Sequence, residues 1–167
     1  MKKTAAMIVI ALSTLALAAF LYAEWSSKAA TESTVLSSDQ AAMLARGDVA
    51  MGFDKDKIMH HFMSTSTGGR IMIVALNSSD TQTILQIKDH VADIEKEFSE
   101  GNFTKPFFIH DQQVPGTDVM AEKKDLIRYS VEQLSEGAVL TLTTDDAELI
   151  QAIQQFMQFQ GQEHQGH

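Results

Sequence analysis

The sequence predicts an α+β domain that follows an N-terminal export segment. Three observations support this prediction. An uncharged run follows two lysines at the start of the chain, apolar residues recur at helical spacing between 84 and 98, and two β-prone runs flank a turn at 135–137. The 167 residues suffice for one domain with a leader and are too few for two comfortable domains.

Residues 1–23 are predicted to be a signal peptide or a membrane anchor. After Lys2 and Lys3, residues 4–23 carry no charge and are rich in Ala, Leu, Ile and Val. A cleaved signal core usually has about 7–15 apolar residues and a membrane-spanning helix about 20, so the length fits either fate. The two lysines stay in the cytoplasm in both cases. The rest is expected in the periplasm, soluble after cleavage or anchored to the inner membrane.

The charge and the missing cysteines limit the partners of the exported part. Without the two leading lysines, 11 basic residues stand against 22 acidic ones, a formal charge near -11. This argues against a nucleic-acid partner, because a polyanion requires a basic surface. An exported chain without cysteine has no disulfides and no thiolate ligands, so any metal site must use His, Met, Asp and Glu.

The expected order is an export segment, a tether, one folded domain and a short tail. Residues 24–50 contain much Ala, Ser and Thr and few large apolar residues, which is typical of a flexible tether, with one short helix from Ser38 to Gly47. The α+β domain is expected over residues 51–160, and residues 161–167 form a polar tail that should fray.

The first half of the domain is predicted to be a helix, a strand and a second helix. Asp54 can cap a helix that runs to about Ser64, and residues 70–77 are an apolar run of strand length with β-branched residues at its centre. Asp80 can cap the second helix. Its apolar side chains have the spacing of one buried stripe: Ile84, Ile87, Val91, Ile94 and Phe98.

The second half begins with a long connection over 101–125, in which residues 107–110 are expected to form a short edge strand. The runs 126–134 and 138–143 are β-prone and are separated by a short turn, so they predict a hairpin. A last helix begins near Asp145 and has a wide apolar face.

This order predicts a β-α-β-β-α core with both helices on one face of a small, largely antiparallel sheet. The arrangement resembles an incomplete ferredoxin-like fold that lacks its last strand, here preceded by a short helix. Such a sheet leaves an open edge, which invites a homodimer or a periplasmic protein partner.

No sequence motif of a known catalytic mechanism is present. The chain has no G-x-S-x-G elbow, no phosphate-binding loop, no dinucleotide fingerprint and no H-E-x-x-H zinc helix. An enzymatic function therefore has no positive support. The remaining candidates for chemistry are the six histidines: His60, His61, His90, His110, His164 and His167.

The stretch MHHFM at 59–63 raises the question of a soft-metal site. Adjacent residues of the expected helix point about 100° apart, so His60 and His61 cannot easily grip one ion together. The two methionines and Phe62 lie on the apolar face and are expected to fill the core. The two histidines face away from that stripe and need partners from other elements.

Two further histidines are candidate ligands. His110 precedes Asp111 in the long connection, where it can act as a ligand or as a base oriented by a carboxylate. His164 and His167 have a spacing that permits chelation if the last helix continues so far, although a frayed tail that binds metal adventitiously is an equal alternative. His90 lies beside the buried stripe and is expected to be solvated or to cap a polar group.

Imidazole, thioether and carboxylate ligands together suit copper best, while zinc and haem iron stay open as alternatives. The predicted metal site gathers His60, His61, His110 and His164.

Several motifs together resemble a family of small exported bacterial proteins of uncharacterised function. They are MGFDKDKIMHHF at 51–62, Gly68-Gly69 before a strand, F-x-x-G-N-F at 98–103, P-x-x-x-H at 106–110, PG at 115–116 and FQGQEH at 159–164. The resemblance implies a periplasmic domain in which His60, His61, His110 and His164 match the family's histidine positions. It implies no particular activity.

The leading hypothesis is therefore a periplasmic metal-binding protein that acts as a carrier, a sensor or an accessory factor. One alternative is a structural or adaptor module that docks through its sheet edge without metal. The other is a metal-assisted enzyme that uses His110 with Asp111.

Overall fold

The computed structural model describes residues 38–164. The described residues from 41 onwards belong to one compact unit, and the fold below is that of this unit. The expected signal or anchor at 1–23, most of the expected tether and the end of the tail lie outside the described residues. Within the described part, no helix is both long enough and apolar enough to cross a membrane.

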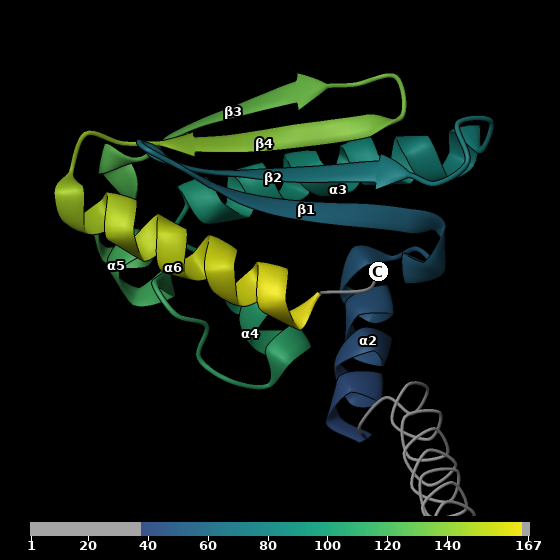
Figure 1. Cartoon of the computed structure of the whole chain (residues 1–167), viewed down its shortest axis with the longest axis horizontal. Helices are drawn as coiled ribbons and strands as arrows, with labels where there is room; N and C mark the ends of the chain where they lie inside the picture. Colours follow the sequence, from purple (N-terminus) through teal and green to yellow (C-terminus); the bar gives the residue numbers. More distant parts are fainter. Residues whose placement is uncertain (1–37, 165–167) are drawn as a thin grey trace, which may run out of the picture. The chain divides into compact units, whose positions relative to one another are not determined.

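The described residues form an α+β fold with five α-helices and a four-stranded sheet, so the predicted fold class is confirmed (Figure 1). The elements are α2 (Ser38–Met51), β1 (Ile58–Thr65), β2 (Gly68–Ala75), α3 (Thr81–Ser99), α4 (Thr104–His110), α5 (Thr117–Glu122), β3 (Arg128–Gln133), β4 (Gly137–Thr143) and α6 (Ala147–Glu163), with short 3-10 turns at Lys55–Lys57 and Lys124–Leu126. The strand order is β1-β2-β4-β3, and every neighbouring pair is antiparallel.

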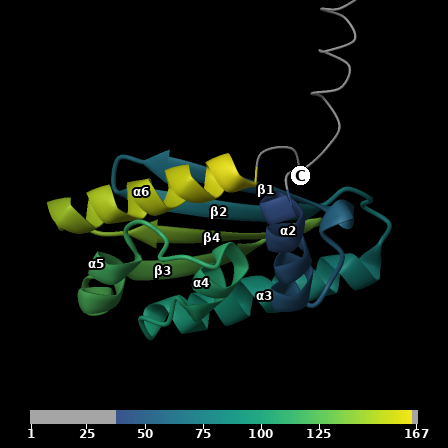
Figure 2. The same ribbon diagram turned by 90° about the horizontal axis from the view of Figure 1, so that it is seen from below.

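The two long helices cover the same face of the sheet. In the view from below, α6 crosses β1 and β2 while α3 runs along the other strands, with α4 and α5 between the two helices (Figure 2). We call the opposite side of the sheet the open face. Residues that alternate along one strand therefore meet either the helices or the open face.

The prediction of a helix over 54–64 is wrong, because these residues form a 3-10 turn and a strand. Asp54 does act as a cap, but only for the 3-10 turn at Lys55–Lys57, where its side chain accepts a hydrogen bond from the backbone N–H of Asp56. The chain then forms the edge strand β1, which pairs along its whole length with β2. A β1–β2 hairpin therefore takes the place of the expected helix and single strand, so the predicted β-α-β-β-α order of the core is not the one observed.

The strand expected at 107–110 is also wrong, because these residues end helix α4. Asn102 accepts a hydrogen bond from the backbone N–H of Thr104 at 3.0 Å, which starts the helix. Pro106 lies in the first turn, where a missing N–H costs nothing. Asp111 ends the helix with φ of 53° in the left-handed region.

Two segments expected to lie outside the fold belong to it. Helix α2 buries Met43 and Leu44, and the Arg46 side chain donates a hydrogen bond to the carbonyl of Ile109 at 2.8 Å. The compact unit accordingly begins at residue 41, not near Met51. At the other end, α6 continues through Glu163 into the expected tail.

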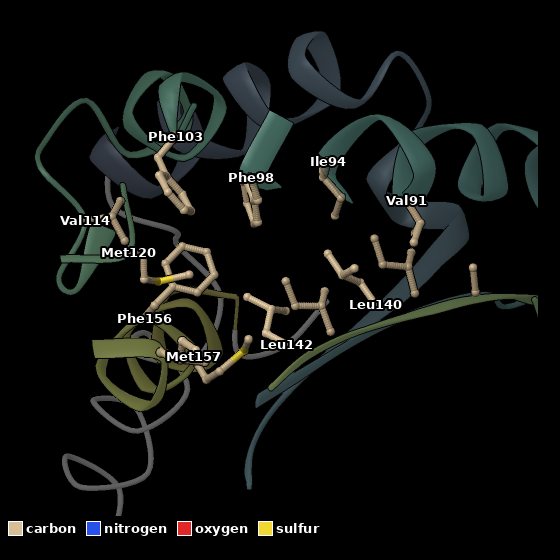
Figure 3. Close-up of a cluster of buried hydrophobic side chains, with 14 of the residues drawn as sticks. Val91, Ile94, Phe98, Phe103, Val114, Met120, Leu140, Leu142, Phe156 and Met157 are labelled. Carbon is tan, nitrogen blue, oxygen red and sulfur yellow. The ribbon is translucent and has the colours of Figure 1, made fainter. Parts of the chain in front are cut away.

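The core lies between α3, α6 and the inner face of the sheet (Figure 3). The predicted stripe of α3 is fully or almost fully buried, which confirms that helix. From α6, Phe156 packs edge-on against Phe98 and Phe103, and Met157 lies below Leu142 of β4. The predicted hairpin is confirmed as β3 and β4, whose inward residues Leu140 and Leu142 are fully buried.

The turn between β1 and β2 depends on a glycine. Gly68 has φ of 142°, and a Cβ there would collide with the carbonyl oxygen of Leu142. We expect Gly68→Ala to lower the free energy of unfolding by about 3 kcal/mol, because strain and overpacking act together. Gly52→Ala is the matched control: its φ is also positive, but nothing lies within 4 Å, so a loss of about 1 kcal/mol is expected. Urea unfolding of both variants measures the difference, and equal losses would contradict this account.

Candidate metal centre

Strand β1 sends His60 and His61 to opposite sides of the sheet. His60 pairs with Ile73, whose side chain is 1% exposed beneath the helices, whereas His61 pairs with Met72 on the open face. The expected angle of about 100° between them on a helix is therefore wrong, because successive strand residues alternate between faces. The predicted four-histidine site is split by the sheet, and His61 lies on the other side from the remaining three.

The other three predicted histidines come together on the helix side. The ring centres of His60 and His164 are 5.6 Å apart, and those of His164 and His110 are 5.4 Å apart. They come from β1, from the C-terminal cap of α6 and from the last turn of α4. We call these three residues the histidine trio. His164 is its middle member, and its ring also stacks on Phe62 at 5.6 Å.

His110 is the most buried member of the trio, with 7% of its surface exposed. Its Nε2 lies 2.8 Å from Oε1 of Gln160, which is itself buried. A carbonyl oxygen only accepts, so Nε2 carries the proton and the lone pair of the neutral ring is on Nδ1. This Nδ1 is buried and has no hydrogen-bond partner. Burial lowers the pKa of His110, and Arg46 adds to this effect, whereas the hydrogen bond to Gln160 and the charge of Glu163 oppose it.

A buried imidazole nitrogen that is held deprotonated and unpaired has the chemistry of a metal ligand. An imidazole bound to a metal has its ring centre about 3.2 Å from the ion, because metal–nitrogen bonds are about 2.0–2.1 Å long. Two imidazoles on one tetrahedral ion therefore have ring centres about 5.2 Å apart. The separations of 5.6 and 5.4 Å in the trio are close to this value. As the side chains stand, however, no three His, Asp or Glu residues within 38–164 form a group that could hold an ion.

The trio is reached from solvent through a groove along the outer edge of β1. The groove has a volume of about 630 Å³ and borders both sides of this edge strand. It is lined by His60, Phe62 and His164, and also by Met59, His61 and Met63. A smaller cavity of about 70 Å³ lies on the inner side of the same residues, between α2, α3, α4 and the sheet. Gln160 and His90 line this inner cavity.

His90 is a half-buried neighbour of the trio rather than the solvated or capping residue expected from the sequence. Its ring packs edge-on against Phe53 with centres 5.6 Å apart. Burial, and secondarily the positive charge of Lys105, lower the pKa of His90 to about 4. His90 is therefore neutral at physiological pH.

Three features of the site were not predicted from the sequence. Gln160 orients His110, and only its position one turn before His164 in α6 pointed towards the site. Asp111 was expected to orient His110, but the polar partner that the structure gives the ring is Gln160. The two methionines at 59 and 63 were expected in the core, yet each is 37% exposed and lies on the open face. His167 lies outside the described residues.

No protein-family model matches the chain, and neither the curated proteins nor the solved structures contain a match. The function of the protein is therefore inferred from its residues and their geometry.

The low pKa of His90 makes folding stability depend on pH. The unfolded chain binds a proton at this side chain near pH 6.5, whereas the folded protein binds it only near pH 4. The free energy of unfolding is therefore highest above about pH 6.5, where the His90 ring is neutral in both states. It falls by about 2–3 kcal/mol as the pH drops towards 4, because only the unfolded chain takes up the proton in this range. We expect His90→Gln, which cannot titrate, to flatten the dependence of the unfolding free energy on pH in this window. Denaturant unfolding from pH 4 to 7.5 measures both proteins, and parallel curves would contradict the assignment.

Proposed function

We propose that this chain is a periplasmic metal-binding protein that acts as a carrier, sensor or accessory factor, with His60, His110 and His164 as its ligands. One observation carries the proposal: the ring of His164 contacts those of His60 and His110, which come from two other elements, and His110 Nδ1 is buried without a hydrogen-bond partner. An unpaired buried polar atom is costly, so a ligand for it is a physical reason for this arrangement.

Binding at the trio requires rotation of side chains and little movement of the backbone. The ring centres already have the spacing of two imidazoles on one ion, and His164 lies at the C-terminal cap of α6. Gln160 would then keep the proton of His110 on Nε2 and present Nδ1 to the metal.

The ligand type favours a divalent ion of the copper and zinc group. An all-nitrogen set binds Cu(II) more tightly than Zn(II), following the general order of stability for first-row metals. Haem stays an alternative, because the groove beside His60 and His164 has about 630 Å³, above the roughly 300 Å³ at which ligand sites begin. The acidic net charge also favours a cation over an anion.

The groove favours a carrier or accessory role over a permanently buried structural metal. It leaves His60 and His164 within reach of solvent, so an ion can enter and leave without unfolding. The charged and apolar pattern of the N-terminal sequence supports the proposed export, and the resemblance to small exported proteins agrees with it.

A second proposal is an adaptor function without metal. Strand β1 lies at the sheet edge beside the large groove, where an added strand from a second copy or a protein partner can pair. In that case association is insensitive to chelators, which distinguishes it from metal-dependent behaviour in size-exclusion chromatography.

His60→Asn and His164→Asn should each weaken Cu(II) binding at least about tenfold, because each removes one imidazole ligand. His61→Asn is the matched control: it changes the adjacent residue in the same way, but on the other side of the sheet. It should leave Cu(II) affinity unchanged. Isothermal titration of the tagless full chain measures all four proteins.

Two results would contradict the metal function. One is wild-type binding no tighter than about 10 μM, an affinity near -7 kcal/mol that ordinary surface histidines reach. The other is an equal loss in His61→Asn and His60→Asn, which would place the ion outside the trio.

A further inference from the structure

The open face of β1 carries a second group of metal ligands that is separate from the histidine trio. Met59, His61 and Met63 occupy alternate positions of β1, and Met72 lies directly opposite His61 on β2. We propose that these four side chains, the methionine face, bind Cu(I). This inference does not depend on the trio, because the two groups share no residue, although both border the groove along the edge strand β1.

Strand geometry brings His61 and Met72, together with either Met59 or Met63, within reach of one ion. Directly opposed residues such as His61 and Met72 have Cβ atoms about 4.5–5.5 Å apart. Met59 and Met63 lie about 6.8 Å from His61 along the strand. Both are diagonal neighbours of Met72 at about 7–8 Å, a distance that long side chains bridge. Met59 and Met63 are about 13.6 Å apart along the strand, too far to share one ion. The ion is therefore held by His61, Met72 and one flanking methionine, between which it can exchange.

The exposure of these methionines fits ligands better than core residues. A solvent-facing side of an antiparallel sheet normally carries polar residues. Here Met59 and Met63 are each 37% exposed, whereas Met120 and Met157 in the core are 0% and 1% exposed. Exposed thioethers gain little from burial, so their gathering around one imidazole needs another cause.

The ligand chemistry selects Cu(I). Thioethers are soft ligands that prefer Cu(I), and imidazole serves copper in both oxidation states. The neighbouring positions on this face also limit the charge of the ion: Arg70 is paired with Met63, and Val74 is paired with Met59. A monocation suffers less repulsion from the Arg70 guanidinium than a divalent ion does. The two sides of β1 therefore favour different ions, Cu(II) or Zn(II) at the trio and Cu(I) at the methionine face.

The first experiment titrates the full chain with Cu(I) under anaerobic conditions and follows the methionine ε-methyl groups by NMR. The signals of Met59, Met63 and Met72 should shift together and saturate at one equivalent. Met120 and Met157 are internal controls that should not move, because they are buried away from this face. Shifts spread evenly over all methionines, or none on β1, would overturn the proposal.

The second experiment replaces the thioethers in a triple variant, Met59→Leu, Met63→Leu and Met72→Leu. Leucine has a similar volume and apolar character, so the fold should be retained. Cu(I) affinity, measured against a competing chelator, should fall at least a hundredfold, while Cu(II) binding at the trio stays unchanged. Unaltered Cu(I) affinity in a folded triple variant would overturn the proposal.

The double variant His60→Asn, His164→Asn separates this inference from the proposed function. It removes two trio ligands and leaves every residue of the methionine face in place. Retained Cu(I) binding with lost Cu(II) binding supports two separate sites. If Cu(I) binding is lost as well, the thioethers are not the ligands and the methionine face is refuted.

Discussion

Successive side chains of a β-strand point to opposite faces, and this constraint on β1 determines which side chains His60 and His61 can meet. Because His60 points towards the helices, it can meet His164 from α6, which in turn contacts His110 from α4. Because His61 points away, it meets Met72 and the two methionines beside it. Two adjacent histidines thereby belong to two chemically different environments separated by one layer of backbone.

The inner environment depends on the long helices as much as on β1. Helix α6 packs across β1 and β2, so its C-terminal cap ends beside His60. Gln160, one turn earlier, fixes the proton of His110 on Nε2 and leaves Nδ1 without a partner. The hydrophobic contacts that hold α6, such as Phe156 against Phe98, therefore also set the geometry of the trio.

The sequence alone predicts the secondary structure correctly where the apolar pattern fits only one kind of element. The stripe of α3 repeats with a helical period over four turns, and its buried residues are those predicted.

The sequence predicts a helix where β1 forms, because apolar side chains occupy both faces of this strand. Ile58 and Phe62 point inwards while Met59 and Met63 point outwards, and these four positions have the i, i+1, i+4, i+5 spacing of a helix. A polar outer face would have shown the alternation of a strand. Local rules often fail at functional positions, and the outward methionines that hid this strand are the ones assigned here to copper.

The candidate site could be predicted in part. Residue type alone pointed to the four histidines as candidate ligands. In the structure, the ring of one of them, His164, contacts those of His60 and His110. The exclusion of His61 could not be foreseen without knowing that β1 is a strand. The role of Gln160 depends on contact between residues 50 positions apart, which periodicity within a single segment does not reveal.

The most direct test of the account is a crystal structure of the full chain grown with Cu(II) and recorded at the copper absorption edge. A metal site at the histidine trio predicts an anomalous peak on the helix side of the sheet. The peak should lie about 2.0–2.1 Å from ring nitrogens of His164 and of at least one of His60 and His110. A peak that joins His60 and His61, or peaks confined to surface carboxylates, would contradict it.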